Sequence, residues 1–440
     1  MPDIYQIVNS TQLDNDLEDV ADAIRAKSQG QSALIFPSEF ISEIGSIPTG
    51  ASITGQTDVT AEAGENIAAG DTVYIVQNYH RLPFPQRAGN NPNYISISND
   101  GTKIAVCISS SPYIYIWDMS VWPWERLPNP STLPAGQAMQ CSWNNDGTRL
   151  AVAHASSPYI TVYDTTTTPY TKLTNPGTLP TGAGNGCAFN PDGTRLAVGH
   201  ASSPYITVYD TTTIPYTKLT NPGTLPGYTS SKCAWSPDGT RLAVGKTGGA
   251  RTTIYNTTTS PYTKLSDPAT LPGEPYDLKF SPDGTRLAIG HANSPFFTVY
   301  DTTVSPYTVV TSLPTTPAGA INRVSWAPNG SFICLSGSNK LDTKVYDVGT
   351  TPWGAGPSLT PYPEYSSMGC DWSSNGRLVI GYGALWRLAI YPTNLAAPMM
   401  YKASNECADG SGYIYGYSPS AVAAGNSGTV KVIFEQTIGE

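Results

Sequence analysis

The residues best suited to chemistry in this sequence are three histidines, His154, His200 and His291, which share one position of a repeated segment. Imidazole is the commonest metal ligand in proteins and transfers protons near neutral pH. A single zinc ion would need several such ligands at bond lengths of about 2 Å. Equivalent residues of successive repeats lie apart in space, so we expect the histidines to line loops as hydrogen-bonding groups and predict no metal site. Lys246 fills the equivalent place in a further repeat.

The recurring acids favour a structural role as well. Four aspartates follow short alternating segments, where a carboxylate can cap a turn: Asp164, Asp210, Asp301 and Asp347. Asp-Gly turns such as Asp146-Gly147 hold one carboxylate each, whereas a calcium loop supplies about six or more oxygen ligands. The chain has no Gly-x-Ser-x-Gly elbow, no phosphate-binding glycine loop and no paired-histidine zinc motif. We therefore predict no catalytic residue and no cofactor.

Composition excludes several classes of function. The net charge is −9 and the pI is about 5.0, so the chain has no basic footprint for nucleic acid. No apolar run approaches the roughly 20 residues that span a bilayer, and the first residues lack the features of a secretory signal. We expect no nucleic-acid partner, no membrane insertion and no export. Four cysteines share an apolar repeat position, which predicts buried side chains rather than disulfides: Cys141, Cys187, Cys233 and Cys370.

A glycine-containing turn recurs seven times along the chain, at steps of 45 or 46 residues. The turns are Asp100-Gly101, Asp146-Gly147, Asp192-Gly193, Asp238-Gly239, Asp283-Gly284, Asn329-Gly330 and Asn375-Gly376. The spacing persists through the less regular sixth and seventh copies. It therefore indicates one structural unit repeated seven times.

Each unit contains four short segments with the alternation of β-strands, as residues 186–220 illustrate. Strands are predicted at 187–189, 196–199, 205–209 and 216–219, separated by Asn-Pro-Asp-Gly, His-Ala-Ser-Ser-Pro and Asp-Thr-Thr turns. Four short strands whose polarity rises outward are typical of a propeller blade. The predicted fold is mainly β: a seven-bladed β-propeller over residues 78–402, inserted in a small β-domain, with an N-terminal α-helical hairpin.

The ends of the repeat region suggest how the ring closes. Thr72–Val76 and Tyr79–Pro83 have the pattern of a third and a fourth blade strand. After the seventh turn, residues 388–391 and 399–402 either complete the last blade or leave a place for an N-terminal strand. A closure shared between the two ends is predicted, because an unpaired edge strand is otherwise exposed.

The flanks predict two attachment modules. Residues 11–27 carry an apolar stripe opposite acids, and residues 36–44 form a second short helix. The apolar faces of this anchoring module, residues 1–50, are Leu13, Leu17, Val20, Ile24, Phe40 and Ile44. Residues 51–77 and 403–440 both contain strand-like segments joined by Ala-Gly turns, which predicts a split β-domain around the propeller.

Two resemblances follow from these motifs. The segments Ser-Pro-Asp-Gly-Thr-Arg-Leu-Ala-Val-Gly and Ile-Thr-Val-Tyr-Asp resemble WD-repeat propellers, and Trp117-Asp118 carries the dipeptide itself. The Gly-His that precedes the inner strand of typical WD repeats is missing, so their buried His–Asp network is not carried over. The helix Ala-Asp-Ala-Ile-Arg-Ala-Lys, with Phe-Pro-Ser-Glu-Phe-Ile-Ser-Glu-Ile, looks like the N-terminal module of tailed-phage structural proteins. The Ala-Ala-Gly-Asp-Thr-Val and Ala-Ala-Gly-Asn-Ser-Gly-Thr-Val-Lys-Val segments are similar to β-modules of phage decoration and tail proteins.

The phage resemblance implies a non-enzymatic virion protein of the tail-fibre or head-decoration type, located in the particle. Its ends would attach to other virion proteins, copies of the chain would associate, and the propeller would bind a host-surface glycan or protein. Near-identical repeats also disfavour catalysis, which needs different residues in distinct roles. A cellular WD-like interaction scaffold is the alternative, and a propeller hydrolase ranks last.

The predicted contact surface collects the loops after the second strands with the loops between blades. Tyrosine with serine, asparagine and glycine gives an adaptable contact surface at low entropic cost, although repeated turn chemistry without any ligand explains these residues equally well. The candidate binding residues on this face are Tyr113, His154, Tyr159, His200, Tyr205, Lys246, His291 and Phe296.

Overall fold

The computed structural model describes residues 92–392 apart from short gaps at 121–124, 250, 269–272, 311–316, 340–342, 350–352, 358, 360–366, 375 and 383–386. Outside that range it describes residues 4–6, 53–54, 58–63, 72–76, 399–402, 414–417 and 427–435. The chain divides into two compact units, Gln86–Thr393 and a unit made of Met1–Pro85 with Asn394–Glu440. The predicted helical hairpin, with Leu13, Leu17, Val20, Ile24, Phe40 and Ile44, lies outside the described residues. So do Tyr79–Pro83.

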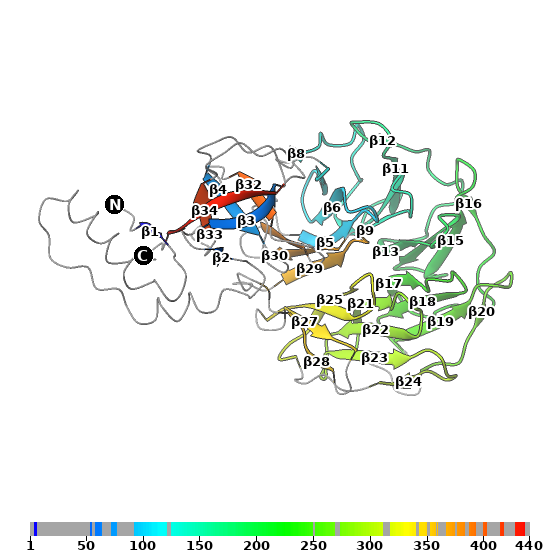
Figure 1. Ribbon diagram of the computed structural model, residues 1–440. Coiled ribbons are helices and arrows are strands. Elements are labelled where there is room, and N and C mark those ends of the chain that lie inside the picture. Colours follow the sequence, from blue (N-terminus) through cyan, green and yellow to red (C-terminus); the bar gives the residue numbers. More distant parts are fainter. Residues whose placement is uncertain are drawn as a thin grey trace, which may run out of the picture. The chain divides into compact units, whose positions relative to one another are not determined.

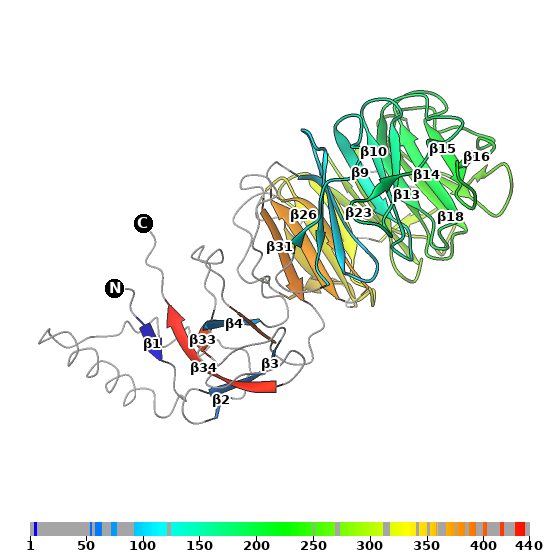
Figure 2. The ribbon, with the colours of Figure 1, turned by 90° about the horizontal axis from the view of Figure 1, so that it is seen from above.

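The larger unit is a seven-bladed β-propeller whose antiparallel sheets surround a common centre (Figures 1 and 2). The first blade contains β5 (Pro92–Ile97), β6 (Lys103–Ile108), β7 (Ile114–Asp118) and β8 (Glu125–Arg126), and the second contains β9 (Ala138–Trp143), β10 (Arg149–His154), β11 (Ile160–Asp164) and β12 (Thr171–Lys172). The third blade contains β13 (Gly184–Phe189), β14 (Arg195–His200), β15 (Ile206–Asp210) and β16 (Thr217–Lys218), and the fourth contains β17 (Ser230–Trp235), β18 (Arg241–Lys246), β19 (Thr252–Asn256) and β20 (Thr263–Lys264). The last three are β21 (Pro275–Phe280), β22 (Arg286–His291), β23 (Phe297–Asp301), β24 (Thr308–Val309); β25 (Ile321–Trp326), β26 (Phe332–Gly337), β27 (Lys344–Asp347), β28 (Gly354–Ala355); and β29 (Ser367–Trp372), β30 (Arg377–Tyr382), β31 (Arg387–Pro392).

The recurring Asp-Gly turn connects the first and second strand in the first five blades, and Asn329-Gly330 takes its place in the sixth. Gly147 has φ of +70°, a conformation that glycine adopts without the steric cost of a Cβ. The Asp146 carboxylate accepts hydrogen bonds from the backbone N–H of Thr148 at 2.9 Å and from its hydroxyl at 2.7 Å. The repeated Asp-Gly-Thr sequence therefore specifies the same tight hairpin in successive blades.

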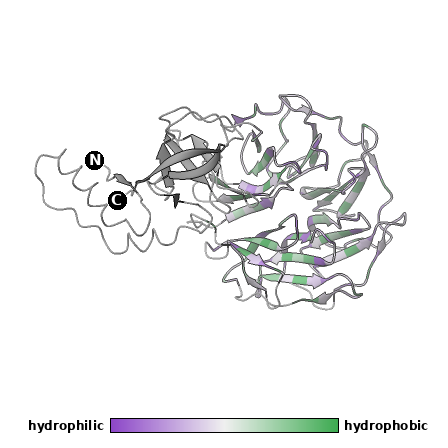
Figure 3. Cartoon of the chain, viewed as in Figure 1, coloured by the Kyte–Doolittle hydropathy of each residue, from purple (hydrophilic) through white to green (hydrophobic). Residues whose placement is uncertain are grey.

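The core of the propeller lies between neighbouring sheets. In one interface, Ile160 and Val162 of the second blade pack with Leu196, Val198 and Tyr209 of the third. Hydrophobic stretches accordingly lie within the strands in Figure 3. The described cysteines, which comprise Cys107, Cys141, Cys187, Cys233, Cys334 and Cys370, are buried and unpaired. This confirms their interpretation as small core side chains.

The ring closes between the seventh and first blades through the same contacts that join other neighbours. Arg377 Nη1 donates to the carbonyl of Gly101 at 2.9 Å, just as Arg241 Nη2 donates to the carbonyl of Gly284 between the fourth and fifth blades. The backbone N–H of Ser374 also donates to the carbonyl of Asn99 at 3.1 Å. The described strands of the seventh blade, β29–β31, come from one continuous part of the chain.

The prediction that Thr72–Val76 contributes to a blade is therefore wrong. This segment is β4, and it pairs antiparallel with β32 (Met399–Lys402) and β33 (Ile414–Tyr417) in the smaller unit. Its edges are satisfied there by main-chain hydrogen bonds. Among the described residues, the seventh and first blades are joined by side-chain and loop contacts.

The smaller unit contains one sheet that returns on itself. Its strands follow the order β1 (Ile4–Gln6), β34 (Ser427–Glu435), β33, β4, β32, β3 (Asp58–Ala63) and β2 (Ile53–Thr54), and β34 also pairs with β3. Strands from before and after the propeller thus pair within a single sheet. Within the described residues, no helix is long and apolar enough to cross a membrane.

Candidate functional site

The loops after the second strands and the loops between blades lie together on one end of the propeller, which we call the loop face. Backbone bonds join them: Ala201 N–H donates to the carbonyl of Ala183 at 3.0 Å, and Ala292 N–H to that of Glu274 at 3.1 Å. A Cβ placed at Gly182 would lie 2.6 Å from Ser202 Oγ. The two kinds of loop are therefore packed closely enough to act as one surface.

Four of the candidate binding residues hold an unusual backbone conformation on this face. They are partly exposed aromatic residues with φ between +65° and +68°: Tyr113, Tyr159, Tyr205 and Phe296. Each closes a tight turn, as in the 2.7 Å bond from Tyr205 N–H to the carbonyl of Ser202. Positive φ is costly for a bulky side chain, and retained backbone strain is a reason to suspect function.

The histidines differ in position from the loop-lining role expected of them. His154, His200 and His291 are all fully buried. The second strand of each blade extends one residue further than predicted, so that the histidine becomes its last residue. Its Nε2 is then 2.9 to 3.0 Å from the hydroxyl of Thr161, Thr207 or Thr298 on the next strand.

Burial removes these histidines from contact with a partner. It also lowers the pKa of each imidazole to about 4. Lys246 is equally inaccessible, with 5% exposure, and its Nζ donates to the carbonyl of Pro226 at 2.9 Å. Within the described part of the chain, no cluster of His, Cys, Asp or Glu could hold a metal ion.

The fourth blade departs from the repeated loop in a way that the sequence analysis did not use. Gly248 and Gly249 replace the two serines of the Ser-Ser-Pro-Tyr turn, and Tyr228, half exposed, lies over them. A Cβ at Gly248 would be 2.5 Å from the Tyr228 ring. The glycines thus make room for an aromatic side chain on the same face.

The innermost strands carry a second set of polar residues, and these are not repeated from blade to blade. Two layers surround the central channel. The first, the Tyr94 layer, is Tyr94, Gln140, Gly186, Lys232, Asp277, Arg323 and Gly369; the second, the Lys279 layer, is Ser96, Ser142, Ala188, Ala234, Lys279, Ser325 and Asp371. Sequence reasoning missed this site because the repeats were compared for what they share. The signal was present in the charged residues that interrupt otherwise apolar first strands.

Both channel acids bridge neighbouring blades. Asp371 Oδ2 accepts a hydrogen bond from Ile97 N–H at 3.0 Å, and its Oδ1 accepts one from Ser325 Oγ at 3.2 Å. Asp277 Oδ2 accepts from Val324 N–H at 3.1 Å. Burial raises the pKa of Asp371, against the opposing influence of Lys279 and these donors. The two carboxylates are thus engaged in holding the ring together.

The cations of the Tyr94 layer gather around one aromatic ring. Arg323 lies 4.8 Å and Lys232 Nζ 5.8 Å from the centre of the Tyr94 ring. Lys232, with 7% exposure, donates to the carbonyls of Asn185 at 2.6 Å and Met139 at 3.3 Å. Burial, and next the charge of Arg323, lower the pKa of Lys232 to about 8.

This lowered pKa predicts a specific pH dependence of stability. Between pH 8 and 10.5 the unfolded chain keeps a proton on Lys232 that the folded chain has released, so stability rises with pH. From pH 7 to 9.5 the gain is about 2 kcal/mol. Urea denaturation should show this gain in the native protein and not in Lys232→Met. An equal pH response in both proteins would contradict the assignment.

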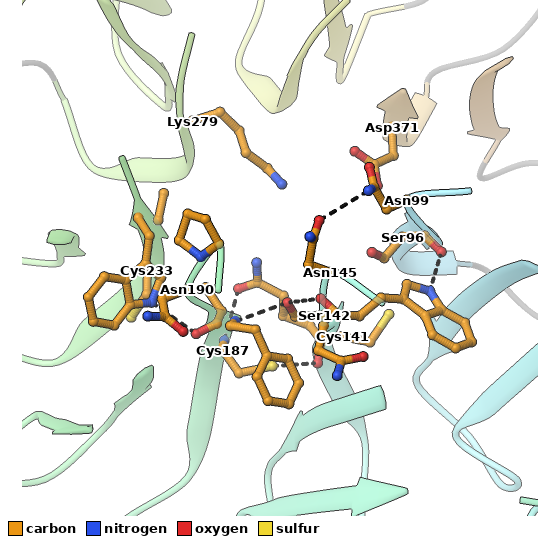
Figure 4. A pocket seen from close by; sticks show the side chains of 18 of the residues that line it. Ser96, Asn99, Cys141, Ser142, Asn145, Cys187, Asn190, Cys233, Lys279 and Asp371 are labelled. Carbon is orange, nitrogen blue, oxygen red and sulfur yellow. Dashed lines mark hydrogen bonds between the residues drawn. The ribbon is translucent and has the colours of Figure 1, made fainter. Parts of the chain in front are cut away.

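A cavity of about 300 Å³ occupies the channel at the end formed by the Asp-Gly turns, opposite the loop face. Lys279 extends into it from the fifth blade, across from Asp371 and Ser96 (Figure 4). Interaction with Tyr94, and then with Asp371 and Asp277, raises the pKa of Lys279 against the opposing effect of its burial.

Comparisons with known proteins agree with the propeller architecture. Residues 243–393, or 151 of the 440, match the family described as eukaryotic translation initiation factor eIF2A. Hydrazine synthase of Kuenenia stuttgartiensis is similar at 15% identity and a TM-score of 0.55, over 71% of this chain and 97% of that one. The Cps50 (Swd1) β-propeller domain of Myceliophteria thermophila is similar at 13% identity and a TM-score of 0.55, over 70% of this chain and 97% of that one. No curated protein sequence matches. These identities show the fold alone, which for the larger unit is a seven-bladed β-propeller.

Proposed function

We propose that this protein is a non-catalytic binding protein of a tailed-phage virion that presents its propeller to a host-surface glycan or protein. The observation that carries the binding role is the loop face, where aromatic side chains are held at positive φ in successive blades. Tyr159 and Tyr205 lie in identical Ser-Ser-Pro-Tyr turns. Rigid aromatic side chains contribute contact area at little entropic cost, and repeated copies on one surface favour multivalent binding.

The absence of catalysis is proposed from the chemistry of the channel. Non-repeated acids and cations in a propeller channel are what an enzyme would need. Here each carboxylate already accepts a main-chain N–H from the next blade, which is a structural role. Their main-chain bonds distinguish Asp277 and Asp371 from a poised acid–base pair.

The virion assignment comes from the sequence motifs of the flanks. In this proposal residues 1–50 and the split β-domain attach the chain to other virion proteins, and several copies associate in the particle. The location is then the virion, in a tail-fibre or decoration role. Neither a nucleic acid nor a membrane is required.

A cellular scaffold that binds a protein partner is the second candidate. It is favoured by the eIF2A match and by the similarity to the Swd1 propeller domain. Both candidates use the loop face, so they differ in where the chain is found rather than in how it binds.

One experiment with particles produced from the encoding genome tests the proposal. Full-length chains carrying Tyr159→Gly and Tyr205→Gly should enter particles normally but reduce adsorption to host cells at least tenfold. Glycine tolerates the positive φ, so the fold is retained while the contact side chains are lost. Ile214→Ser with Val304→Ser, exposed residues of other hairpins, is the matched control.

Deletion of residues 1–50 examines attachment in the same particles. The truncated chain should be missing from purified particles while the full chain is detected by mass spectrometry. A full chain missing from particles overturns the virion role, and unchanged incorporation of the truncated chain overturns the anchoring role. Unchanged adsorption by the glycine variants overturns binding through the loop face.

A further inference from the structure

The channel cavity exists because small residues interrupt the Lys279 layer. Three consecutive blades place Ser142, Ala188 and Ala234 there, while Lys279 and Asp371 stand opposite. The space of about 300 Å³ is at the lower end of the range for small-molecule sites, the size of a monosaccharide derivative. Buried aromatic residues complete the wall, among them Trp143 and Phe189. The cavity is thus a polar recess with both charged and aromatic side chains in its wall.

The floor of the cavity separates it from the loop face. Tyr94 and Gln140 line its inner end, with 4% and 3% exposure. Arg323 and Lys232 lie against the Tyr94 ring. A ligand in the cavity therefore enters from the Asp-Gly turn end, independently of any partner bound at the loop face.

The charge of the channel favours an anion. The two layers contain three cations, Lys232, Lys279 and Arg323, and two carboxylates, Asp277 and Asp371, an excess of one positive charge in a chain whose net charge is −9. Charges in a partly desolvated channel are poorly screened, so one negative charge is favoured there. A phosphate monoester brings close to two charges at neutral pH and would exceed this balance.

The individual groups specify what else the ligand must carry. Lys279 offers ammonium donors, of which Tyr94 takes at most one. The hydroxyl of Ser96 makes no hydrogen bond with the described residues. Asp371 accepts from Ile97, Ser325 and the backbone of Trp372, and a carboxylate has about four acceptor positions, so it can accept one further hydrogen bond. A ligand with one carboxylate and several hydroxyl groups supplies both the acceptor that faces Lys279 and the donors that face Asp371.

We propose that the central cavity binds a small hydroxy acid of the sugar-acid type. Its carboxylate pairs with Lys279, and its hydroxyls donate to Asp371 and exchange hydrogen bonds with Ser96 and Gln140. The site is distinct from the loop face, so it stands or fails separately from the proposed function.

Calorimetric titration of the full-length protein tests this site with D-glucuronate, with D-glucose as the neutral analogue and with D-glucose 6-phosphate as the dianion. Glucuronate should bind with a Kd on the order of 0.1 mM, and glucose at least tenfold more weakly. Lys279→Met should weaken glucuronate binding at least tenfold. The matched control is Lys264→Met, whose lysine pairs with Asp267 at 2.9 Å on an outer strand, and it should bind as the native protein does.

A second variant keeps the charges and removes the space. Ala188→Leu should abolish glucuronate binding with Lys279 in place, and far-ultraviolet circular dichroism establishes that each variant is folded. Absence of glucuronate binding to the native protein overturns the proposal, as does unchanged binding by a folded Lys279→Met. Equal binding of glucose overturns the role of the carboxylate, and tighter binding of the phosphate overturns the monoanion assignment.

Discussion

Acidification from pH 7 to pH 5 should destabilise this propeller by about 6 kcal/mol through three buried histidines alone. His154, His200 and His291 are fully buried and each has a pKa of about 4, against an ordinary value of 6.5. Between these two pH values the unfolded chain binds three protons, one on each histidine, that the folded chain does not bind. Stability therefore falls as the pH falls through this window, by about 2 kcal/mol per histidine at pH 5.

The effect is large against the stability of a typical domain, about 5 to 15 kcal/mol. The described aspartates whose pKa values are lowered do not produce it in this range, and the raised pKa of Asp371 has the opposite sign, because it makes stability rise as the pH falls. Hydrogen bonds from Thr148 and Thr212 lower the pKa values of Asp146 and Asp210, so their contribution is lost only below the ordinary value of 3.8. Acid sensitivity between pH 6.5 and pH 4.5 thus reports on the histidines.

A graded series of variants measures this contribution. Single, double and triple replacement of the histidines by glutamine, which can still bond the neighbouring threonine, should each remove a further 2 kcal/mol or so of the difference in unfolding free energy between pH 7 and pH 5. Denaturant titrations followed by tryptophan fluorescence supply the values. Full acid sensitivity in the triple variant would show that other groups are responsible.

The number of blades and most strand positions were predictable from the sequence because they rest on local chemistry. The Asp-Gly-Thr turn and the alternation of Tyr205–Tyr209 specify a hairpin without reference to the rest of the chain. β15 and its partner strand were found within one or two residues of their predicted limits. Periodicity then fixed the number of blades.

The features that sequence reasoning missed depend on contacts between distant segments. Whether His200 ends a strand or starts a loop is decided by its bond to Thr207 and by packing from the next blade. The pairing of β4 with β32 and β33 joins segments more than 300 residues apart. Likewise, Lys279 and Asp371 share a cavity only because seven sheets close into a ring. A comparison of repeats identifies the positions that the blades share and therefore misses those at which they differ.

Asp371→Ala should be among the most destabilising single substitutions in the propeller, at about 3 to 5 kcal/mol. The closing interface joins blades that are far apart in sequence, and Asp371 connects them by accepting the Ile97 N–H at 3.0 Å. Alanine leaves that donor without its acceptor and removes the stronger of the two carboxylate interactions of Lys279, so that only Asp277 remains. Asp371→Asn should lose less stability than Asp371→Ala, because asparagine keeps an oxygen that accepts the Ile97 N–H. Its neutral side chain also avoids the cost of burying a charge, the cost that raises the pKa of Asp371.

Ser142→Ala is the matched control, because Ser142 Oγ accepts Phe189 N–H at 3.2 Å between two blades that are adjacent in the chain. Loss of this neutral hydrogen bond should cost about 1 kcal/mol. Urea denaturation at pH 7 compares the three variants with the native protein. If a buried charge holds the ring closed, Asp371→Ala lowers the free energy of unfolding most, Asp371→Asn lowers it less, and Ser142→Ala lowers it least. Equal losses for Asp371→Ala and Ser142→Ala would mean that closure rests on the aromatic and apolar contacts between sheets, with the carboxylate contributing no more than any other inter-blade bond.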